Sequence, residues 1–417
     1  HFGSRGGAGH LATSALDPEA PSLCKADRAM FPNTLRRGAL ALSAGAGAAA
    51  LSLARLPQAP RDPKKPSWGG ALRCDSLREQ GNWTTRHGPL RILTGNMHPD
   101  LANDIAKKVG VELSPSTVNQ FKNGEIQVLL HETMRGCDVF VIQATCNPDP
   151  NTSLMELLIM LDAARRGGAE RITAVMPIYA YARQDKKDRA RAPITGKLVA
   201  DMLGIAGANR VVTIDLHASQ IQGFVTYPLD NLYAMPLLER FLTEHFAGRK
   251  VPQEDIVVVS PDAGAAKRAQ YLATGLGDVP LAIFSKQRLR PNEVSKMILV
   301  GEVKDKVCVI IDDMADTCGT LVLAAKELKQ AGAKEVIAVI THGIFSSDAL
   351  DKINKSDLTM VVCTDTIPMN DNQKRCPKLA VISVADLLAR SIVGAHLDQS
   401  MESLFKWDAP GRPSLSH

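Results

Sequence analysis

The chain has 417 residues, of which 45% are hydrophobic and 22% are charged. This composition is typical of a folded globular protein, and the length predicts two or three domains. The net charge of +5 lies at one end: residues 1–88 hold 12 Lys and Arg against 6 Asp and Glu, and the remainder holds 37 against 38. Because the larger part is nearly neutral, charge gives no reason to expect a nucleic-acid partner.

Residues 1–88 are rich in Gly and Ala and show no sustained hydrophobic period. The stretch between Asp27 and Asp62 contains arginines but no acid, which is typical of an organelle transit peptide. A signal peptide or a disordered extension is the alternative. The uncharged run 38–54 is short and weakly hydrophobic for a membrane span, so we expect no membrane partner. We therefore expect a cytoplasmic protein, or a plastid or mitochondrial one if the leader is a transit peptide.

The hydrophobic pattern of the sequence changes at Arg91. From there on, short apolar runs alternate with helical patterns. Such runs predict an α/β fold with mainly parallel sheets covered by helices on both faces. Helices are expected to end at Gly in three places, followed at once by a strand. We expect two α/β domains, 89–235 and 236–406, between a leader (1–88) and a tail (407–417). The expected strands are residues 139–144, 171–177, 210–216, 255–261, 307–312, 335–342, 360–365 and 379–384.

The eight cysteines form no CxxC pair and show no zinc spacing. Several lie within apolar, strand-like runs, where buried thiols are common. We expect reduced, unpaired cysteines, as in a reducing compartment.

The stretch 307–320, VCVIIDDMADTCGT, combines an apolar strand, two adjacent acids and a turn of small and hydroxyl residues. Ligands of open α/β sheets bind at the carboxyl ends of strands. A turn at a helix start gathers backbone N–H groups that hold phosphate, and the neighbouring carboxylates suit sugar hydroxyls. We therefore expect a sugar-phosphate site with Asp312 and Asp313 at the strand's end. A capped helix with surface Asp residues is the alternative.

The same stretch resembles the phosphoribosyl-diphosphate motif of type I phosphoribosyltransferases and ribose-phosphate diphosphokinases. Five further motifs resemble the diphosphokinases in that family's order, and the likeness covers about residues 91–406. The family consists of two tandem type I phosphoribosyltransferase-like domains, each a mainly parallel sheet flanked by helices. The motifs are FKNGE (121–125), YARQDKKDRARAPIT (181–195), DLHASQIQGF (215–224), SPDAGAAKRA (260–269) and KQRLRPNEV (286–294).

The resemblance implies an enzyme that transfers the diphosphoryl group of ATP to the anomeric hydroxyl of ribose 5-phosphate, giving 5-phosphoribosyl 1-diphosphate and AMP for nucleotide biosynthesis. Its catalytic pair would be Lys286 and Arg288, cations on a loop that closes over developing charge. The implied ATP-binding residues are Phe121, Asn123, Gly124, Glu125, Arg183, Gln184, Asp185, Lys186, Lys187 and Asp188. Those implied for ribose 5-phosphate are Arg288, Asp312, Asp313, Asp316, Thr317, Cys318, Gly319 and Thr320.

The cofactor implied is Mg²⁺, with His217 and Asp262 as ligands and Asp215 and Asp230 as nearby candidates. A histidine ligand is unusual for this ion, which prefers few protein oxygens completed by water and substrate phosphates. Two positions depart from the family pattern: Thr226 replaces an acid found in some members, and Ala265 replaces a usual Gly.

By resemblance we expect a homo-oligomer, a hexamer in many family members, with paralogous subunits as further partners. Two alternatives remain open at this point. A type I phosphoribosyltransferase would leave the ATP-side motifs unexplained. A non-catalytic regulatory subunit of the same complex would be expected to lose the basic loop or the metal positions, whereas Lys286, Arg288, His217 and Asp262 are all present.

Overall fold

The computed structural model describes residues 87–287 and 296–405. Within these residues the side chains of Lys286, Gln287, Lys296, Met297, Ser403 and Phe405 are outside the description. The leader and the tail expected from the sequence lie outside the described residues, apart from His87 and Gly88. No helix in the described ranges is both long and apolar enough to span a bilayer.

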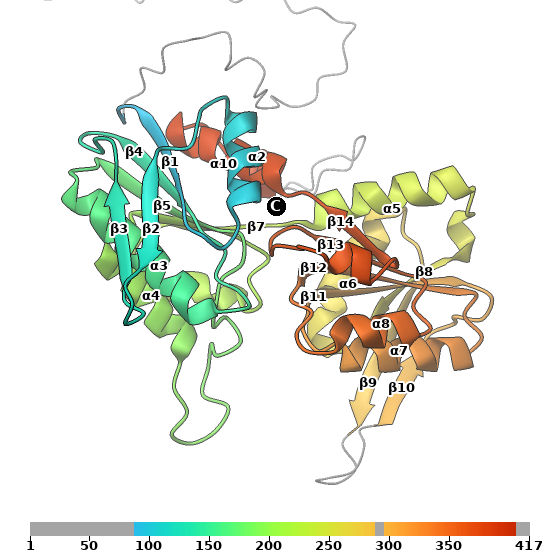
Figure 1. The fold of residues 1–417 in the computed structure, drawn as a ribbon. Coiled ribbons are helices and arrows are strands. Elements are labelled where there is room, and N and C mark those ends of the chain that lie inside the picture. The colour runs from blue at the N-terminus through green and yellow to red at the C-terminus, as the bar shows by residue number, and fades with distance from the viewer. Residues whose placement is uncertain (1–86, 288–295, 406–417) are drawn as a thin grey trace, which may run out of the picture. The chain divides into compact units, whose positions relative to one another are not determined.

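The first sheet contains five parallel strands in the order β1-β4-β5-β6-β7 (Figure 1). These strands follow one another in chain order, except that a separate hairpin comes between β1 and β4 in the sequence. The hairpin consists of β2 (Ser116–Gln120) and β3 (Ile126–Leu130). The strands are β1 (Leu90–Thr94), β4 (Asp138–Ile142), β5 (Arg171–Met176), β6 (Arg210–Ile214) and β7 (Leu229–Leu232).

The second sheet contains seven strands in the order β10-β9-β8-β11-β12-β13-β14. All neighbours are parallel except β9 and β10, which form an antiparallel pair at one edge. The strands are β8 (Ile256–Ser260), β9 (Leu281–Gln287), β10 (Lys296–Val300), β11 (Val307–Ala315), β12 (Glu335–Gly343), β13 (Met360–Thr364) and β14 (Leu379–Ile382).

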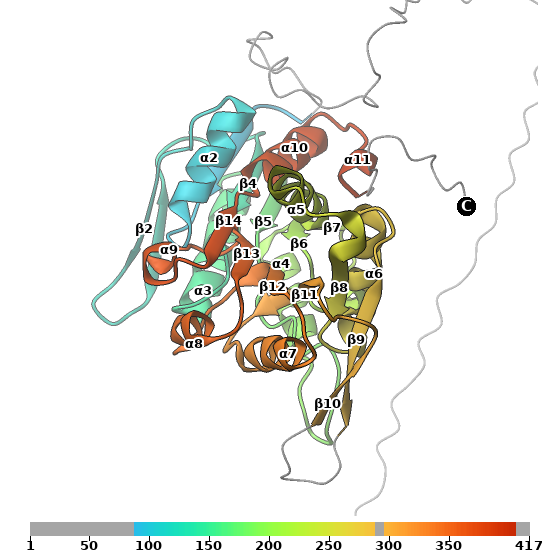
Figure 2. The same ribbon diagram turned by 90° about the vertical axis from the view of Figure 1, so that its right-hand side faces the viewer.

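The helices connect successive strands and cover the sheets (Figure 2). The longer ones are α2 (Pro99–Val109), α3 (Pro150–Arg166), α4 (Thr195–Ala206), α5 (Met235–Arg249), α6 (Ala266–Gly275), α7 (Gly319–Gln330) and α10 (Ala385–His396). The shorter ones are α8 (Ala349–Lys355), α9 (Asn372–Arg375), α11 (Glu402–Phe405) and the 3₁₀ turns η1 (Ser219–Phe224), η2 (Gln253–Asp255) and η3 (Ala263–Ala265).

Strand β11 shows why the apolar runs fold as buried parallel strands. Side chains alternate between the two faces of a strand. Val307, Val309 and Ile311 pack into the core that also holds residues of α5 and α10, while Cys308 and Ile310 pack into the core beneath α7 and α8. Because helices cover both faces, every position has to be apolar, and the run loses the polar alternation of a half-exposed strand.

All eight expected strands are present. Two of the predicted helix ends carry glycines in backbone conformations that other residues rarely adopt, with φ of 120° at Gly207 after α4 and 91° at Gly332 after α7. The six cysteines in the described ranges are unpaired and buried, as expected.

The last long helix, α10, packs against α2 from the first half of the chain. The contact is fixed by Asp138 at the start of β4: Arg171 donates hydrogen bonds to its Oδ1 and Oδ2 at 2.9 and 2.5 Å, and His396 Nδ1 lies 2.9 Å from Oδ2. The sheets are built from residues on either side of position 235, whereas α10 packs back on the first half. The domain boundaries proposed from the sequence stay a prediction.

Candidate active site

Strand β11 continues past the acidic pair to Ala315, whereas the sequence analysis expected the strand to end at these acids. Pairing with β8 stops at Ile310, but pairing with β12 continues to Ala315. The last residues of β11 therefore extend past β8 with a neighbour on one side only. Such an overhang lets a strand carry polar side chains, because one flank is no longer covered by the sheet.

The turn Asp316–Thr320 follows the strand and opens helix α7. Cys318 adopts a left-handed conformation with φ of 58° immediately before the helix. At Gly319 a Cβ atom would meet nothing within 4 Å, so this backbone faces open space. Backbone N–H groups of a helix start that face a cavity form a site for an anion.

This open space is a pocket of about 210 Å³. It brings the turn together with Asp312 and with two residues predicted for other roles, Arg183 for nucleotide and Asp262 for metal. Three strand ends meet here: Asp312 lies near the end of β11, Asp262 follows β8, and Arg183 follows β5. The remaining lining residues are Met314, Ala315, Leu321 and Ile340, with all five residues of the turn.

Arg183 joins the two halves of the chain at the pocket. Its Nη1 donates to Asp316 Oδ2 at 2.8 Å, and its Nε lies 2.9 Å from Met314 Sδ. Burial by itself would raise the pKa of Asp316, but hydrogen bonds from Ser346 and Arg183 and the charge of Arg183 outweigh it and lower the pKa. Asp316 is therefore an anion at neutral pH and holds the guanidinium beside the turn.

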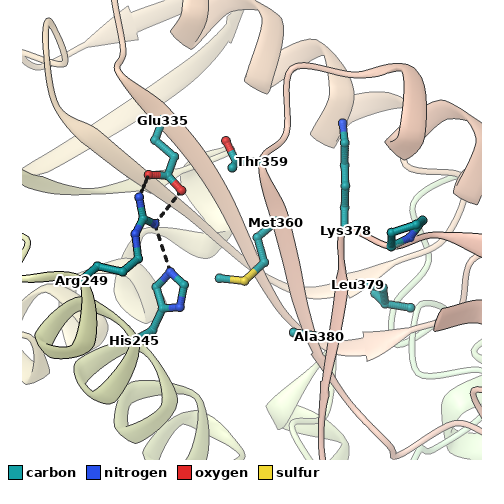
Figure 3. A pocket seen from close by; sticks show the side chains of 9 residues that line it. His245, Arg249, Glu335, Thr359, Met360, Lys378, Leu379 and Ala380 are labelled. Atoms are coloured by element: carbon teal, nitrogen blue, oxygen red, sulfur yellow. Dashed lines mark hydrogen bonds and ion pairs between the residues drawn. The ribbon is translucent and has the colours of Figure 1, made fainter. Parts of the chain in front are cut away.

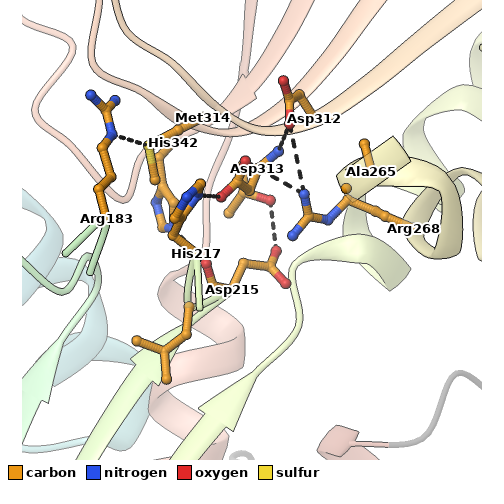
Figure 4. Close-up of polar contacts among 12 residues, drawn as sticks. Arg183, Asp215, His217, Ala265, Arg268, Asp312, Asp313, Met314 and His342 are labelled. Atoms are coloured by element: carbon orange, nitrogen blue, oxygen red, sulfur yellow. Dashed lines mark hydrogen bonds and ion pairs between the residues drawn. The ribbon is translucent and has the colours of Figure 1, made fainter. Parts of the chain in front are cut away.

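The adjacent acids Asp312 and Asp313 differ in their surroundings (Figure 4). Burial and the neighbouring carboxylate raise the pKa of Asp312 to about 7. For Asp313 burial acts in the same direction, but a hydrogen bond with His217 and the charge of Arg268 reverse the outcome and lower its pKa. Where two carboxylates adjoin, the one with cationic partners ionises at lower pH and the other ionises only as the pH rises toward neutral.

His217 reaches Asp313 from the other half of the chain, three residues after β6. Its Nδ1 lies 2.6 Å from Asp313 Oδ2, and this hydrogen bond raises the pKa of the imidazole. No partner among the described residues bonds Nε2, and the side chain is 41% exposed. Asp262 Oδ1 accepts from the backbone N–H groups of Gly264 and Ala265 at 3.0 and 3.2 Å, which fixes its turn at the pocket.

These two residues fit a magnesium ion. In the described ranges no cluster of three or more His, Cys, Asp or Glu is arranged to hold a metal. Mg²⁺ needs no such cluster, since one or two carboxylates with water and substrate phosphates suffice. An imidazole whose Nδ1 bonds a carboxylate presents Nε2 to a metal, which is how metal-ligating histidines are usually held. Asp262 lines the pocket, and His217 lies outside its lining, bonded to Asp313 next to the pocket-lining Asp312.

The other two metal candidates have protein partners of their own. Asp215 is buried, and its Oδ2 accepts hydrogen bonds from Thr341 Oγ1 at 2.6 Å and from the Ala234 backbone at 3.2 Å. Asp230 forms an ion pair with Arg210 across strands β6 and β7. Neither residue lines the pocket.

The residues predicted to bind ATP fall into two groups that the structure does not bring together. Phe121–Glu125 form the tip of the β2–β3 hairpin, with Gly124 at φ of 88° and Phe121 51% exposed. No hydrogen bond or ion pair between described residues links this tip to Arg183 or Gln184. Gln184 bonds Thr195, and Asp185 is buried and bonds Gln220. Lys186, Lys187 and Asp188 are exposed.

The predicted catalytic pair is only partly within the described residues. Lys286 has its backbone in β9, where it pairs with Met297, and its side chain is outside the description. Arg288 lies outside the described residues altogether. Both roles therefore stay predictions.

Sequence reasoning missed three residues that surround the acids. Arg268 on α6 lies 3.6 Å from Asp313 Oδ1 and 3.9 Å from Asp312 Oδ1. His342 is buried, and its Nε2 donates to the carbonyl of Ile214, which joins β12 to the end of β6. Thr341 bonds Asp215. Of these, only Arg268 had a sequence signal, because it falls in the motif SPDAGAAKRA three residues after the departure at Ala265.

A second pocket, of about 370 Å³, lies at the opposite ends of the second sheet's strands (Figure 3). Glu335, Met360 and Leu379 are the first residues of β12, β13 and β14. Here Arg249 donates to both oxygens of Glu335, at 2.9 and 2.7 Å, and lies 3.1 Å from His245 Nε2. The charges of Arg249 and Glu335 therefore pair with each other within the protein.

The fold and the first pocket together define an α/β protein in which a strand with paired acids leads into a turn at a helix start, the arrangement expected of a type I phosphoribosyltransferase-like fold. Comparison with known proteins narrows this class. The family described as the N-terminal domain of ribose phosphate pyrophosphokinase matches residues 90–207, and the phosphoribosyl synthetase-associated domain matches residues 281–406. The chain belongs to the ribose-phosphate pyrophosphokinase family, a family of transferases.

The sequence of the chain aligns with curated relatives over nearly their whole length. Ribose-phosphate pyrophosphokinase A of Dictyostelium discoideum is 52% identical over 316 residues, covering 76% of this chain and 98% of the relative. Ribose-phosphate pyrophosphokinase 3 of Saccharomyces cerevisiae is 48% identical over 317 residues, covering 76% and 97%. A crystal structure of phosphoribosylpyrophosphate synthetase from Mycobacterium smegmatis has a TM-score of 0.70 and 45% identity, covering 74% of this chain and 99% of that one. The family and fold predicted from the motifs are confirmed.

Proposed function

We propose that the 210 Å³ pocket is where the chain transfers the diphosphoryl group of ATP to ribose 5-phosphate. The observation that carries this proposal is the meeting of three strand ends at one cavity, which is lined by the turn Asp316–Thr320, the carboxylates of Asp312 and Asp262, and the guanidinium of Arg183. The family membership supports the same reaction.

Ribose 5-phosphate binds with its phosphate on the turn Asp316–Thr320 and its hydroxyls toward Asp312. The open backbone at Gly319 supports the first contact, because a phosphate can approach it without meeting a side chain. The position of Asp312 in the pocket wall beside the turn supports the second.

The reaction is a displacement at the β-phosphorus. The anomeric oxygen forms a new bond to this phosphorus, and the bond from the β-phosphorus to the oxygen that bridges it to the α-phosphorus breaks. AMP leaves with the bridging oxygen, and the hydroxyl proton is released. Lys286 and Arg288 neutralise charge on the transferred group, which is the main requirement of a loose phosphoryl-transfer transition state.

Magnesium would be held by His217 and Asp262 together with substrate phosphates and water. When bound, it neutralises triphosphate charge and polarises the phosphorus–oxygen bonds. Asp215 and Asp230 keep their protein partners and shape the loops that carry the ligands.

Nucleotide binding uses Arg183 at the pocket and the hairpin tip Phe121–Glu125. Since no hydrogen bond or ion pair between described residues joins the tip to Arg183 or Gln184, and Phe121 is half exposed, the hairpin of a second copy of the chain is a natural source for the adenine contact. This assignment agrees with the homo-oligomer expected by resemblance. Mass photometry of the purified protein tests the oligomer, and a monomer that turns over at full rate would contradict it.

The activity itself is tested by measuring AMP formation from ATP and ribose 5-phosphate in the presence of Mg²⁺. We expect AMP in amounts equal to the phosphoribosyl diphosphate formed, and no AMP when ribose 5-phosphate is omitted. Absence of AMP with all substrates present, from a folded protein, would favour the regulatory-subunit alternative.

A further inference from the structure

The neighbouring acids of β11 point to different parts of the site. Successive residues of a strand face opposite sides. Asp312 lines the pocket and its side chain is 34% exposed, whereas Asp313 does not line the pocket and its side chain is 8% exposed. Only one member of the pair is therefore presented to a ligand that occupies the turn.

Both carboxylate oxygens of Asp313 face protein groups. Oδ2 lies 2.6 Å from His217 Nδ1, and Oδ1 lies 3.6 Å from the guanidinium of Arg268. Its backbone N–H donates to Asp312 Oδ1 at 2.9 Å, which fixes the angle between the two acids. A ribose hydroxyl that bound Asp313 would have to displace one of these partners.

The bond to Asp313 decides which nitrogen of His217 is left without a partner among the described residues. A carboxylate only accepts hydrogen bonds, so Nδ1 has to carry the hydrogen. In the neutral ring Nε2 then has a lone pair, the form that can ligate a metal. His217 and Asp313 are separated by 96 residues, so this orientation exists only because the two halves of the chain meet here.

We propose that Asp313, held by Arg268, is a positioning residue for His217, and that Asp312 alone of the acidic pair binds ribose. Arg268 lies on α6, which follows the turn of Asp262. The contacts of Asp313 with Arg268 and His217 therefore link three segments. The segments after β8 and after β6 carry the proposed metal ligands, and β11 carries the proposed ribose carboxylate. The proposal rests on the proposed function for the roles of ribose and metal, but the geometry of His217 is independent of it.

The test uses two matched isosteric variants of the full chain, Asp313→Asn and Asp312→Asn. In the metal-free wild-type protein, long-range ¹H–¹⁵N spectra should show His217 as the Nδ1–H tautomer, with its signals identified by their loss in His217→Ala. Asp313→Asn should shift this tautomer, because an amide can donate to Nδ1 as well as accept from it. Asp312→Asn should leave it unchanged.

Steady-state kinetics then separates the two acids. Asp313→Asn should raise the Mg²⁺ concentration needed for half-maximal rate about 10- to 100-fold, the usual effect of losing a carboxylate behind a metal-ligating histidine, with the KM for ribose 5-phosphate within about twofold of wild type. Asp312→Asn should raise the KM for ribose 5-phosphate and leave the Mg²⁺ concentration needed for half-maximal rate near its wild-type value. In a His217→Ala background, Asp313→Asn should have no further effect on Mg²⁺ activation.

A rise in the KM for ribose 5-phosphate in both variants, with unchanged Mg²⁺ activation in Asp313→Asn, would make both acids ribose ligands and overturn the proposal. If Asp313→Asn fails to fold, the wild-type spectrum still decides, since an Nε2–H tautomer at His217 contradicts the geometry. A wild-type protein that forms no AMP would refute the proposed function, and the tautomer would remain measurable.

Discussion

Charged residues at the amino ends of the parallel strands differ in their contacts from those at the carboxyl ends. At the amino ends, charges pair with one another: Asp138 at the start of β4 bonds Arg171 at the start of β5, and Glu335 at the start of β12 bonds Arg249. At the carboxyl ends, Asp312 and the Asp316–Thr320 turn face a pocket. The amino-end pocket is the larger, at about 370 Å³ against about 210 Å³. What distinguishes a reactive site is therefore the direction of its polar groups and not the size of its cavity.

The largest effect is expected at an amino end. Asp138 is fully buried, and Asp138→Ala leaves Arg171 without its buried partner, with only the half-exposed Asp398 at 3.5 Å, which should lower the free energy of unfolding by about 3–5 kcal/mol. Because α10 bonds the same carboxylate through His396, the loss also loosens that helix. Denaturant unfolding measures the change, and kcat of the fraction that stays folded should be unaltered.

The pH dependence of this effect has a defined sign. Burial would raise the pKa of Asp138, but hydrogen bonds from Arg171 and His396 hold it below its ordinary value. A carboxylate with a lowered pKa stabilises the fold above the pKa of the unfolded chain, about 4, and loses this contribution as the pH falls through the folded value. The stability difference between wild type and Asp138→Ala should therefore shrink in acid. A difference that grew in acid would contradict the assignment.

Substitution of the predicted catalytic cations, Lys286 and Arg288, should lower the catalytic rate and not the stability. Lys286→Ala and Arg288→Ala should each lower kcat by about 10²–10³-fold, the usual effect of removing one preorganised charge donor, with little change in KM. Lys378→Ala is the matched control, because Lys378 lines the amino-end pocket and donates to the carbonyls of Ile353 and Ser356. Near-normal kcat with weakened ATP binding would assign the segment to nucleotide capture.

The next largest effect is expected at Asp312, the proposed ribose ligand. Asp312→Asn keeps the shape of the pocket wall and removes a charge-assisted hydrogen bond worth about 1.5–3 kcal/mol, so the KM for ribose 5-phosphate should rise by roughly 10- to 150-fold. The affinity for a non-hydrolysable ATP analogue, measured by calorimetry, should survive. Weakened nucleotide binding with intact sugar-phosphate binding would reverse the assignment of the two substrates.

The same isosteric change at the other end of the sheet should alter stability only slightly. Glu335→Gln removes one partner of an ion pair in which Arg249 is 45% exposed, so solvent screens it and the loss should be about 1 kcal/mol or less. Both Michaelis constants should stay at wild-type values. A kinetic defect here would show that the amino-end pocket belongs to the site.

The leader should give the smallest effect, because every motif lies beyond Arg91 and residues 1–88 lack a core-forming pattern. A protein that begins at Pro89 should fold and keep its kcat. If it were insoluble or inactive while the full chain worked, the leader would be part of the fold. A fusion of residues 1–88 to a fluorescent protein tests the organellar alternative, which predicts import.

The sequence predicted the buried strands because their signal is local: a strand covered on both faces has to be apolar throughout, as β11 and β12 are. It did not predict β7, whose four residues LDNL are half polar, the hairpin β2–β3, or the strands β1, β9 and β10. It also ended β11 at its first carboxylates, because polar residues usually mark the end of a buried strand.

The site was predictable where its residues are contiguous and not where they meet through the fold. The turn Asp316–Thr320 is one segment with a recognisable composition, and it lies at a pocket. The pairing of Asp313 with His217 depends on contact between segments 96 residues apart, for which one sequence has no signal. The metal candidates Asp215 and Asp230 share a sequence neighbourhood with His217, but their partners, Thr341 and Arg210, were visible only in three dimensions.

We propose that the carboxyl-end pocket directs the anomeric oxygen of ribose 5-phosphate to the β-phosphorus of ATP. This is tested by ³¹P spectroscopy of the reaction with ribose 5-phosphate labelled with ¹³C at C1. We expect a diphosphate coupled to the labelled carbon, formed in step with AMP and in greatly reduced amount in Gly319→Val, whose side chain would occupy the proposed phosphate position. Formation of ADP, or of AMP with free diphosphate and no coupling to ¹³C, would contradict it.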